Sequence, residues 1–263
     1  MSILDEIIAH KLQEVAHRQS EIPLSALEPR SGDLRDFAGA LAAPGLQVIA
    51  EVKRKSPSMG DIRLDVDPAS LAKIYARSGA AAISVLTDEK YFGGQLDHVT
   101  AVRAVVDVPV LQKDFILTEY QVHESYHAGA DALLLIADAL DQAQLERLYG
   151  LASSLGLDVL VEGYSDDALA RIQRLGPSIA GINARDLNTM TIDLTAMLER
   201  RSLLPEGAIH VAESGITGSR DLARVDQAGF HAALIGTALL KDDDPGQGLE
   251  NFLAGVSPLK AQG

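Results

Sequence analysis

The chain has 263 residues, of which 47% are hydrophobic and 23% charged. This composition is that of a globular protein with a large core and argues against a disordered chain. A formal net charge of -14 argues against a sequence-independent grip on nucleic acid, which requires Lys and Arg to neutralise phosphates. Cysteine is absent, so neither a disulfide framework nor a thiolate nucleophile is available, as is common in a reducing cytoplasm.

The first residues predict a helix and no export signal. Between Ile3 and Arg18, apolar residues recur at helical spacing with charged residues between them. Asp5 and Glu6 interrupt the apolar core that a secretory signal would need, and no apolar run approaches the roughly 20 residues of a membrane span. We therefore expect a cytoplasmic protein with neither a nucleic-acid nor a membrane partner, and we assign residues 1–45 to an N-terminal helical extension.

Eight short apolar runs follow, separated by longer segments of helical pattern. They occupy residues 48–50, 82–86, 108–111, 132–136, 159–161, 179–182, 209–212 and 232–235. Continuous apolar runs are typical of parallel strands that are buried on both faces. Their spacing of roughly 20 to 35 residues fits one strand and a returning helix.

Eight such units predict a closed (β/α)8 TIM barrel of the α/β class, with 1–263 forming a single domain. Gly79, Gly129 and Gly229 precede strands and fit helix ends. An open doubly wound sheet shares the same alternation. We favour the barrel because no Gly-x-Gly-x-x-Gly follows a strand to indicate a dinucleotide site.

Polar residues follow several of the predicted strands, at the barrel end where active sites gather. They are Glu51, Lys53, Lys113, Glu162, Asn183, Arg185 and Glu213. Charged groups at half-buried strand ends form either an ion-pair network or a site. Two lysines and three glutamates that converge from separate strands favour a site for proton transfer.

Two further segments are typical of a phosphate-binding cradle. Ser214 and Gly215 follow the seventh predicted strand, and Gly236 and Thr237 follow the eighth. Glycines at these positions let backbone N–H groups approach phosphate oxygens, and these two loops form the usual phosphate site of barrels. The pair of segments predicts a phosphorylated small-molecule substrate.

One long motif and four shorter blocks carry a family resemblance. Residues 48–58 read VIAEVKRKSPS, and residues 86–94, 111–116, 181–187 and 213–216 read LTDEKYFGG, LQKDFI, GINARDL and ESGI. In this order they resemble the blocks of the indole-3-glycerol-phosphate synthases, which also place a helix ahead of the barrel. The resemblance covers nearly the whole chain.

The resemblance implies a carboxy-lyase of tryptophan biosynthesis that needs no metal or organic cofactor. The family converts 1-(2-carboxyphenylamino)-1-deoxyribulose 5-phosphate into indole-3-glycerol phosphate, with release of carbon dioxide and water. By its pattern, Lys113 is the general acid at the ketone oxygen and Glu162 serves the final dehydration. Lys53 and Glu51 act on the carboxylate and the departing hydroxyl, although the partition of roles among these two residues and Arg185 stays open.

The remaining assignments also follow from the resemblance. Asn183 completes the catalytic set, Ser56, Arg185, Glu213 and Phe115 are substrate-binding, and Ser214, Gly215, Gly236, Thr237 and Lys53 are phosphate-binding. The chain departs from the family at Gly163, Tyr164 and Ala184. None of the three is an assigned acid or base, so we expect activity with altered substrate affinity.

Other interpretations are weaker. His123-Glu-x-x-His127 matches a zinc-protease pattern, yet it falls in a helix that a barrel places on its outer ring, which favours ordinary helix histidines. A phosphoribosylanthranilate isomerase would share the phosphate loops but lack the block around Glu51 and Lys53. A catalytically silent barrel stays an alternative. We expect a monomer or a weak homo-oligomer, with association with other tryptophan-pathway enzymes left open.

Overall fold

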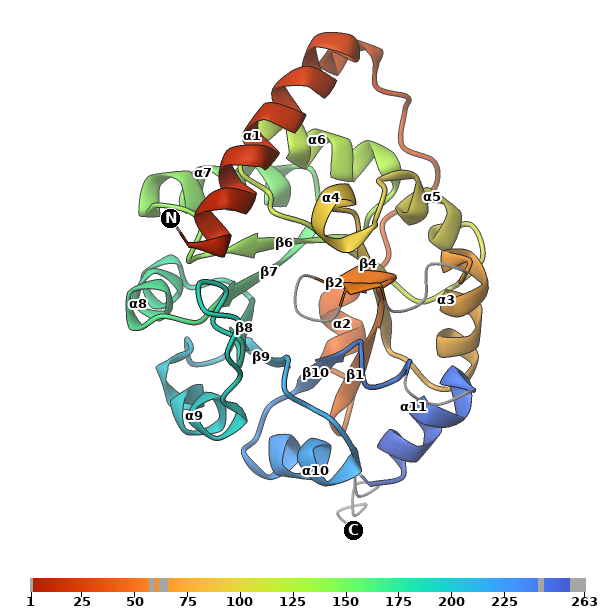
Figure 1. Cartoon of the computed structure of the whole chain (residues 1–263), viewed down its shortest axis with the longest axis vertical. Helices are drawn as coiled ribbons and strands as arrows, with labels where there is room; N and C mark the ends of the chain where they lie inside the picture. The colour runs from red at the N-terminus through yellow and green to blue at the C-terminus, as the bar shows by residue number, and fades with distance from the viewer. Residues whose placement is uncertain (1, 57–59, 62–65, 241–243, 256–263) are drawn as a thin grey trace.

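A computed structural model describes residues 2–56, 60–61, 66–240 and 244–255. Its centre is a closed barrel of parallel strands in the order β1-β10-β9-β8-β7-β6-β5-β4 (Figure 1). The strands are β1 (Gln47–Val52), β4 (Ala82–Leu86), β5 (Val110–Lys113), β6 (Ala132–Ile136), β7 (Asp158–Gly163), β8 (Ile179–Asn183), β9 (Ile209–Glu213) and β10 (Ala232–Ile235). Each of the eight predicted runs overlaps one of these strands, which confirms the predicted TIM barrel.

The strands alternate between two apolar clusters with a period of two residues. Ile49, Leu111 and Leu160 belong to the cluster in the barrel interior, whereas Val48 and Ala50 belong to the cluster between barrel and helices. Because both faces are covered by apolar groups, the strands are almost continuously buried. The alternation fixes which residue at each strand end faces into the barrel.

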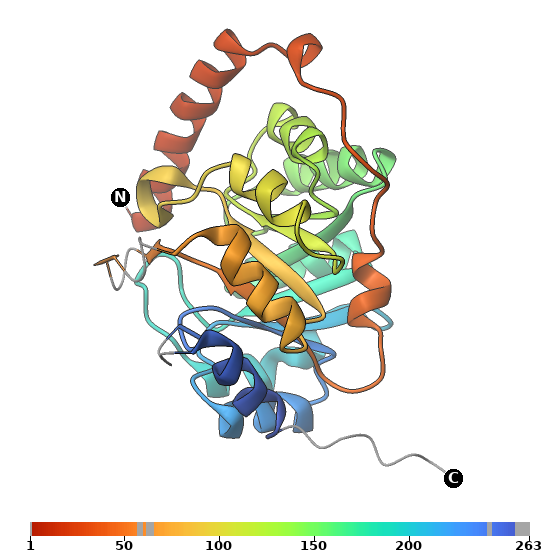
Figure 2. The ribbon, with the colours of Figure 1, turned by 90° about the vertical axis from the view of Figure 1, so that its right-hand side faces the viewer.

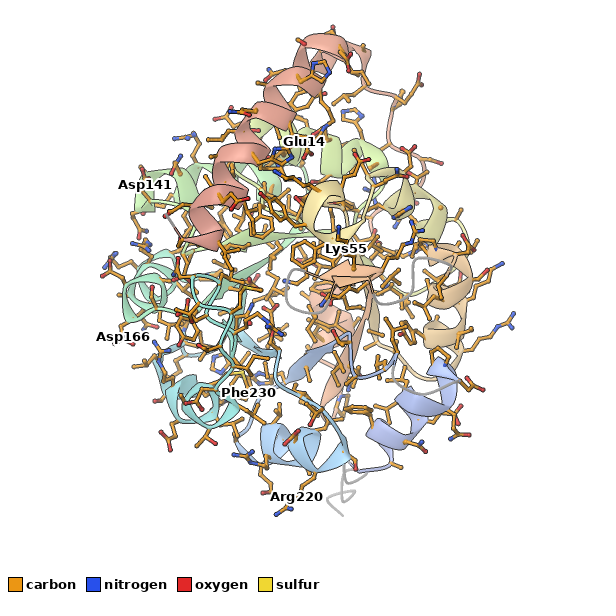
Figure 3. The ribbon with its side chains drawn as sticks, viewed as in Figure 1. Glu14, Lys55, Asp141, Asp166, Arg220 and Phe230 are labelled. Atoms are coloured by element: carbon orange, nitrogen blue, oxygen red, sulfur yellow. The ribbon has the colours of Figure 1, made fainter. Side chains whose placement is uncertain are left out.

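Helices form an outer ring around the strands (Figures 1 and 2). They are α3 (Pro68–Arg77), α5 (Asp97–Arg103), α6 (Glu119–Ala128), α7 (Gln142–Ser154), α8 (Asp166–Leu175), α9 (Leu194–Glu199), η2 (Arg200–Leu203), α10 (Ser219–Gln227) and α11 (Pro245–Leu253). The short helix α4 (Glu89–Phe92) belongs instead to the loop after β4. Figure 3 labels Asp141, Asp166 and Arg220 on this ring, where their side chains are exposed. Gly129 ends α6 with φ +94°, as predicted for a helix-terminating glycine.

The N-terminal extension reaches from one side of the barrel to the other. It contains α1 (Ile3–Glu21), η1 (Leu24–Ala26) and α2 (Phe37–Leu41). Figure 2 shows α1 and α2 on opposite sides of the molecule, joined by an extended segment. Phe37 and Leu41 are fully buried against the interior apolar cluster. The predicted helix after Ile3 is therefore confirmed, and it continues three residues beyond Arg18.

A short hairpin was not expected from the sequence. β2 (Lys55–Ser56) pairs antiparallel with β3 (Gly60–Asp61) above the barrel mouth. Residues 57–59 and 62–65 lie outside the described residues, and so does most of the loop in which the Ser-Pro-Ser motif falls. Among the residues that the structure describes, none of the helices has the length and apolar character of a membrane span.

Candidate active site

Four predicted residues enter the barrel mouth because of the two-residue period of their strands. Glu51, Lys113, Glu162 and Glu213 each stand two positions after an interior apolar residue, which is Ile49, Leu111, Leu160 and Val211 respectively. Side chains that are two residues apart point to the same face of a strand. The sequence thus directs one ammonium and three carboxyl groups from four strands to one point.

Lys113 and two glutamates form the centre of this cluster. Lys113 Nζ donates to Glu162 Oε2 at 3.2 Å and to Glu213 Oε2 at 3.5 Å. Asn183 Nδ2 donates to the other oxygen of Glu162 at 3.3 Å. The glutamate side chains are at most 2% exposed, whereas that of Lys113 is 15% exposed. The ammonium group is therefore the member that a substrate in the mouth can reach.

The two glutamates differ in protonation because one ammonium cannot neutralise both. Burial and the neighbouring charge of Glu162 raise the pKa of Glu213 well above its usual value. Burial opposes ionisation of Glu162 as well, but Lys113 and the hydrogen bonds it receives hold its pKa below the usual value. Burial also disfavours the charge of Lys113, yet the surrounding carboxylates raise its pKa. Like charges at such range push two pKa values apart, so Glu213 holds the extra proton.

A second ion pair lies across the mouth. Lys53 Nζ lies 2.5 Å from Glu51 Oε1, and the Lys53 side chain is 17% exposed. Arg185 donates its backbone N–H to Asn183 Oδ1 at 3.0 Å and its Nη1 to the Met190 carbonyl at 3.2 Å. The structure therefore brings both predicted lysines and Arg185 to the lining of one cavity.

These groups line a cavity of about 280 Å³ at the carboxyl ends of the strands. One side of the cavity is apolar and includes Phe92 and Phe115, whose ring centroids lie 6.2 Å apart at an interplanar angle of 37°. Leu187, Met190 and Ile192 come from the loop after β8. An apolar wall that faces a few convergent charges is typical of a small-molecule site.

Sequence reasoning assigned Phe115 but missed Phe92, Asp114, Leu187, Met190 and Ile192. Phe92 stood inside a block that resembled the family, and Asp114 directly follows Lys113, so both carried a signal. Leu187 also stood inside such a block, at the end of GINARDL, whereas Met190 and Ile192 lie outside the blocks and follow no strand directly. Their contribution depends on the path of a long loop, which spacing does not reveal.

The predicted phosphate segments lie side by side at the same mouth, since β9 and β10 are neighbouring strands. Ser214 and Gly215 adopt successive left-handed conformations with φ of +66° and +74°. Successive residues of this kind turn backbone N–H groups toward one side of a loop. A Cβ at Gly236 would lie 2.3 Å from Glu51 Oε1, so this glycine lets the loop approach the Glu51 carboxylate.

Two of the three departures point away from the cavity. A Cβ at Gly163 would meet Ile172 and Ala168 of α8, and the ring of Tyr164 lies beneath the Arg200 guanidinium, 5.9 Å from centroid to Cζ. Ala184, by contrast, is buried beneath the loop of Ser214 and Gly215. A Cβ added at Gly215 would lie 3.4 Å from the Cβ of Ala184. Of these three residues, Ala184 therefore stands where it could alter the loop of Ser214 and Gly215.

Ser56 lies in β2, and its side chain is outside the described part of the structure. The His-Glu-x-x-His segment lies in α6 on the outer ring, as expected. Glu124 accepts two hydrogen bonds of 2.9 Å from Arg18, and His127 Nδ1 lies 2.6 Å from the Glu28 carbonyl oxygen. Both groups thus hold the N-terminal extension against the barrel.

Fold and site define a TIM-barrel enzyme with a lysine–carboxylate centre beside two glycine-containing loops. The family model for indole-3-glycerol phosphate synthase matches residues 4–252. The chain is 46% identical over 259 residues to the indole-3-glycerol phosphate synthase of Nocardioides sp., covering 97% of this chain and 99% of that protein. It is 43% identical over 261 residues to that of Mycolicibacterium smegmatis, covering 98% and 96%. The chain belongs to the indole-3-glycerol phosphate synthase family.

Solved structures agree with the fold. A 3-hexulose-6-phosphate synthase superposes with a TM-score of 0.61 at 20% identity, covering 81% of this chain and all of that one. The orotidine 5'-phosphate decarboxylase from Pyrococcus horikoshii also gives a TM-score of 0.61, at 11% identity and with the same coverages. At these identities the likeness concerns the barrel alone.

Proposed function

We propose that this chain converts 1-(2-carboxyphenylamino)-1-deoxyribulose 5-phosphate into indole-3-glycerol phosphate, carbon dioxide and water. The single observation that carries the proposal is the Lys113 ammonium at the cavity surface, held between Glu162 and Glu213. A protonated lysine at this point can act as a general acid, which typically contributes about 10² to 10⁴ in rate. Membership of the family supports the identity of the substrate.

Lys113 gives its proton to the ketone oxygen while the ring carbon that bears the carboxylate attacks the ketone carbon. The new carbon–carbon bond closes the five-membered ring and leaves a hydroxyl group. Loss of carbon dioxide then returns the electron pair to the aromatic ring. The buried carboxylates around Lys113 keep its ammonium charged and positioned, so little reorganisation is needed as charge develops.

In the dehydration step, that hydroxyl group accepts a proton and leaves as water. The adjacent carbon of the new ring loses a proton to a base. Glu162 is the proton-transfer group of this step, since Asn183 and Lys113 hold both of its oxygens at the mouth. Lys53 faces the substrate carboxylate or the phosphate, with Glu51 beside it. Arg185, Ser56 and Phe115 contact the substrate, and Ser214, Gly215, Gly236 and Thr237 hold its phosphate.

The whole chain acts as one domain in this proposal, because buried contacts join the N-terminal extension to the barrel at α2 and at α1. A cytoplasmic location follows for the enzyme, since a substrate that carries a carboxylate and a phosphate does not cross a membrane unaided.

The experiment mixes purified protein with the substrate, without added metal, and follows indole fluorescence. The chain contains no tryptophan, so no indole group of the protein contributes to the product's emission. Growth of this emission supports the proposal. A protein that binds the substrate but forms no indole would point to the catalytically silent barrel.

A further inference from the structure

Lys11 of α1 is a fully buried lysine among three carboxylates. Its Nζ lies 2.9 Å from Asp88 Oδ2, 3.0 Å from Asp114 Oδ1 and 3.1 Å from Glu14 Oε1. Glu14, labelled in Figure 3, belongs to the same helix, whereas the two aspartates belong to the barrel. A lysine without solvent contact is costly unless it is fully paired, so this contact joins α1 firmly to two barrel loops.

The first of these loops begins directly after the proposed general acid, Lys113, which ends β5. Asp114 directly follows Lys113 and lines the cavity. Its Oδ1 accepts the Phe115 backbone N–H at 2.7 Å, and its Oδ2 accepts the Thr87 hydroxyl at 2.6 Å. The carboxylate that pairs with Lys11 therefore also fixes the backbone between Lys113 and Phe115.

The second loop carries the aromatic residue that faces Phe115. Asp88 is fully buried and caps α4, where its Oδ1 accepts the Tyr91 backbone N–H at 2.7 Å. Phe92 is the last residue of this short helix and lines the cavity. One ammonium group thus bridges the two segments that supply the facing rings of Phe92 and Phe115.

A second contact of α1 attaches this helix to the barrel at a point away from the active-site cavity. Arg18 makes a two-point ion pair with Glu124 of α6, with both N···O distances at 2.9 Å. Glu124 lies on the outer ring, and neither residue lines the active-site cavity. Arg18 attaches the same helix to the barrel without touching a loop of the site.

We propose that Lys11 is a positioning residue, which sets the Lys113–Phe115 segment and the Asp88–Phe92 segment at the distance that the aromatic end of the substrate requires. This inference rests on the proposed function. The N-terminal extension then acts as part of the active-site frame, although α1 itself supplies no catalytic group.

The test compares Lys11→Met with the matched variant Arg18→Met, which removes a second ion-pair attachment of α1 to the barrel. Lys11→Met keeps the length and burial of the side chain but leaves two buried aspartates without a counter-charge. The variant Lys11→Met/Asp88→Asn removes one of these charges and keeps a capping side chain on α4, and it serves if the single variant does not fold. Circular dichroism and Tm establish folding, and kcat and KM are measured well below each Tm.

We expect KM of Lys11→Met to rise about ten-fold and kcat to fall by a similar factor, because small displacements at a reacting centre can cost up to about 10² in rate. Arg18→Met should stay within about two-fold of the parent in both constants while its Tm falls. Parent-like constants in the Lys11 variants, or an equal loss in Arg18→Met, would overturn the inference.

Titration with indole-3-glycerol phosphate, followed by its indole fluorescence, separates this inference from the proposed function. If the parent protein binds this product but shows no turnover, the result counts against the proposed function alone. In that case, a ten-fold weaker affinity of Lys11→Met for the product would still support the positioning role. Equal affinities of parent and Lys11→Met would overturn the positioning role. A parent that shows neither binding nor turnover would overturn both.

Discussion

Lys113 Nζ lies 3.2 Å from Glu162 Oε2, although the two residues are 49 positions apart and their strands are separated by β6 in the barrel. Each stands two residues beyond an interior leucine, so the closed sheet directs both into the mouth. The pair places a proton donor and a proton acceptor within reach of one substrate. The predictions below examine its chemistry and surroundings.

Removing the ammonium group should abolish most turnover. We expect kcat of Lys113→Ala to fall by about 10² to 10⁴, because the ketone oxygen loses its general acid. Lys73→Ala, which alters an exposed lysine of α3, is the control and should keep the parent kcat. Steady-state indole fluorescence measures both variants. A Lys113→Ala enzyme with parent turnover would remove Lys113 from the mechanism.

The raised pKa of Glu213 predicts a pH-dependent stability. A carboxyl group whose pKa is raised by folding stabilises the protein fully below its unfolded value of about 4.5 and loses this contribution as pH rises through the folded pKa. Glu213→Gln stays neutral at all pH. Its Tm relative to the parent should therefore rise as the pH increases above about 4.5, the unfolded value, and level off once Glu213 is ionised in the folded protein.

The control for this prediction is Glu206→Gln, which alters an exposed glutamate just ahead of β9. Its Tm difference from the parent should stay constant over the same pH range. A Glu213→Gln difference that is also constant would show that Glu213 ionises normally in the folded protein.

A methyl group at Gly236 should disturb the site through Glu51. The added Cβ would lie 2.3 Å from Glu51 Oε1, which forces the carboxylate away from Lys53. We expect Gly236→Ala to lower kcat/KM by about 10- to 100-fold. Gly218→Ala adds the same group where no atom lies within 4 Å and should leave kcat/KM unchanged. Equal values for both variants would contradict the close approach of this loop.

His127 of α6 should matter for attachment of the extension and not for chemistry. His127→Ala loses the hydrogen bond to the Glu28 carbonyl and should destabilise the protein by about 1 kcal/mol with kcat/KM unchanged.

Dialysis against a chelator should likewise leave kcat/KM unchanged. Loss of turnover on chelation, restored by zinc, would contradict the metal-free mechanism.

The barrel was predictable because its strands are continuous apolar runs at regular spacing, and the polar residues after them enter the mouth by simple alternation. Glu51, Lys113, Glu162 and Glu213 follow from this rule. Lys11 does not, because nothing in an amphipathic helix indicates which polar residue will be buried against Asp88 and Asp114. Such contacts depend on how the extension folds back on the barrel.

The protonation states of Glu162 and Glu213 could not be predicted from the sequence either. Glu162 and Glu213 look equivalent as strand-end carboxylates. Their pKa values separate because Asn183 and Lys113 both donate to Glu162, whereas Glu213 has the longer 3.5 Å contact to Lys113 and faces the charge of Glu162. Distances of this kind decide the acid and base roles, and residue spacing does not fix them.

The most direct test of the central claim is to measure carbon dioxide and indole in parallel during a single turnover of the parent, Lys113→Ala and Glu162→Gln. The account predicts one carbon dioxide per indole in the parent and neither product from Lys113→Ala. It also predicts carbon dioxide without indole from Glu162→Gln, because ring closure precedes dehydration. Carbon dioxide release by Lys113→Ala at the parent rate would contradict the assignment of Lys113 as the acid that closes the ring.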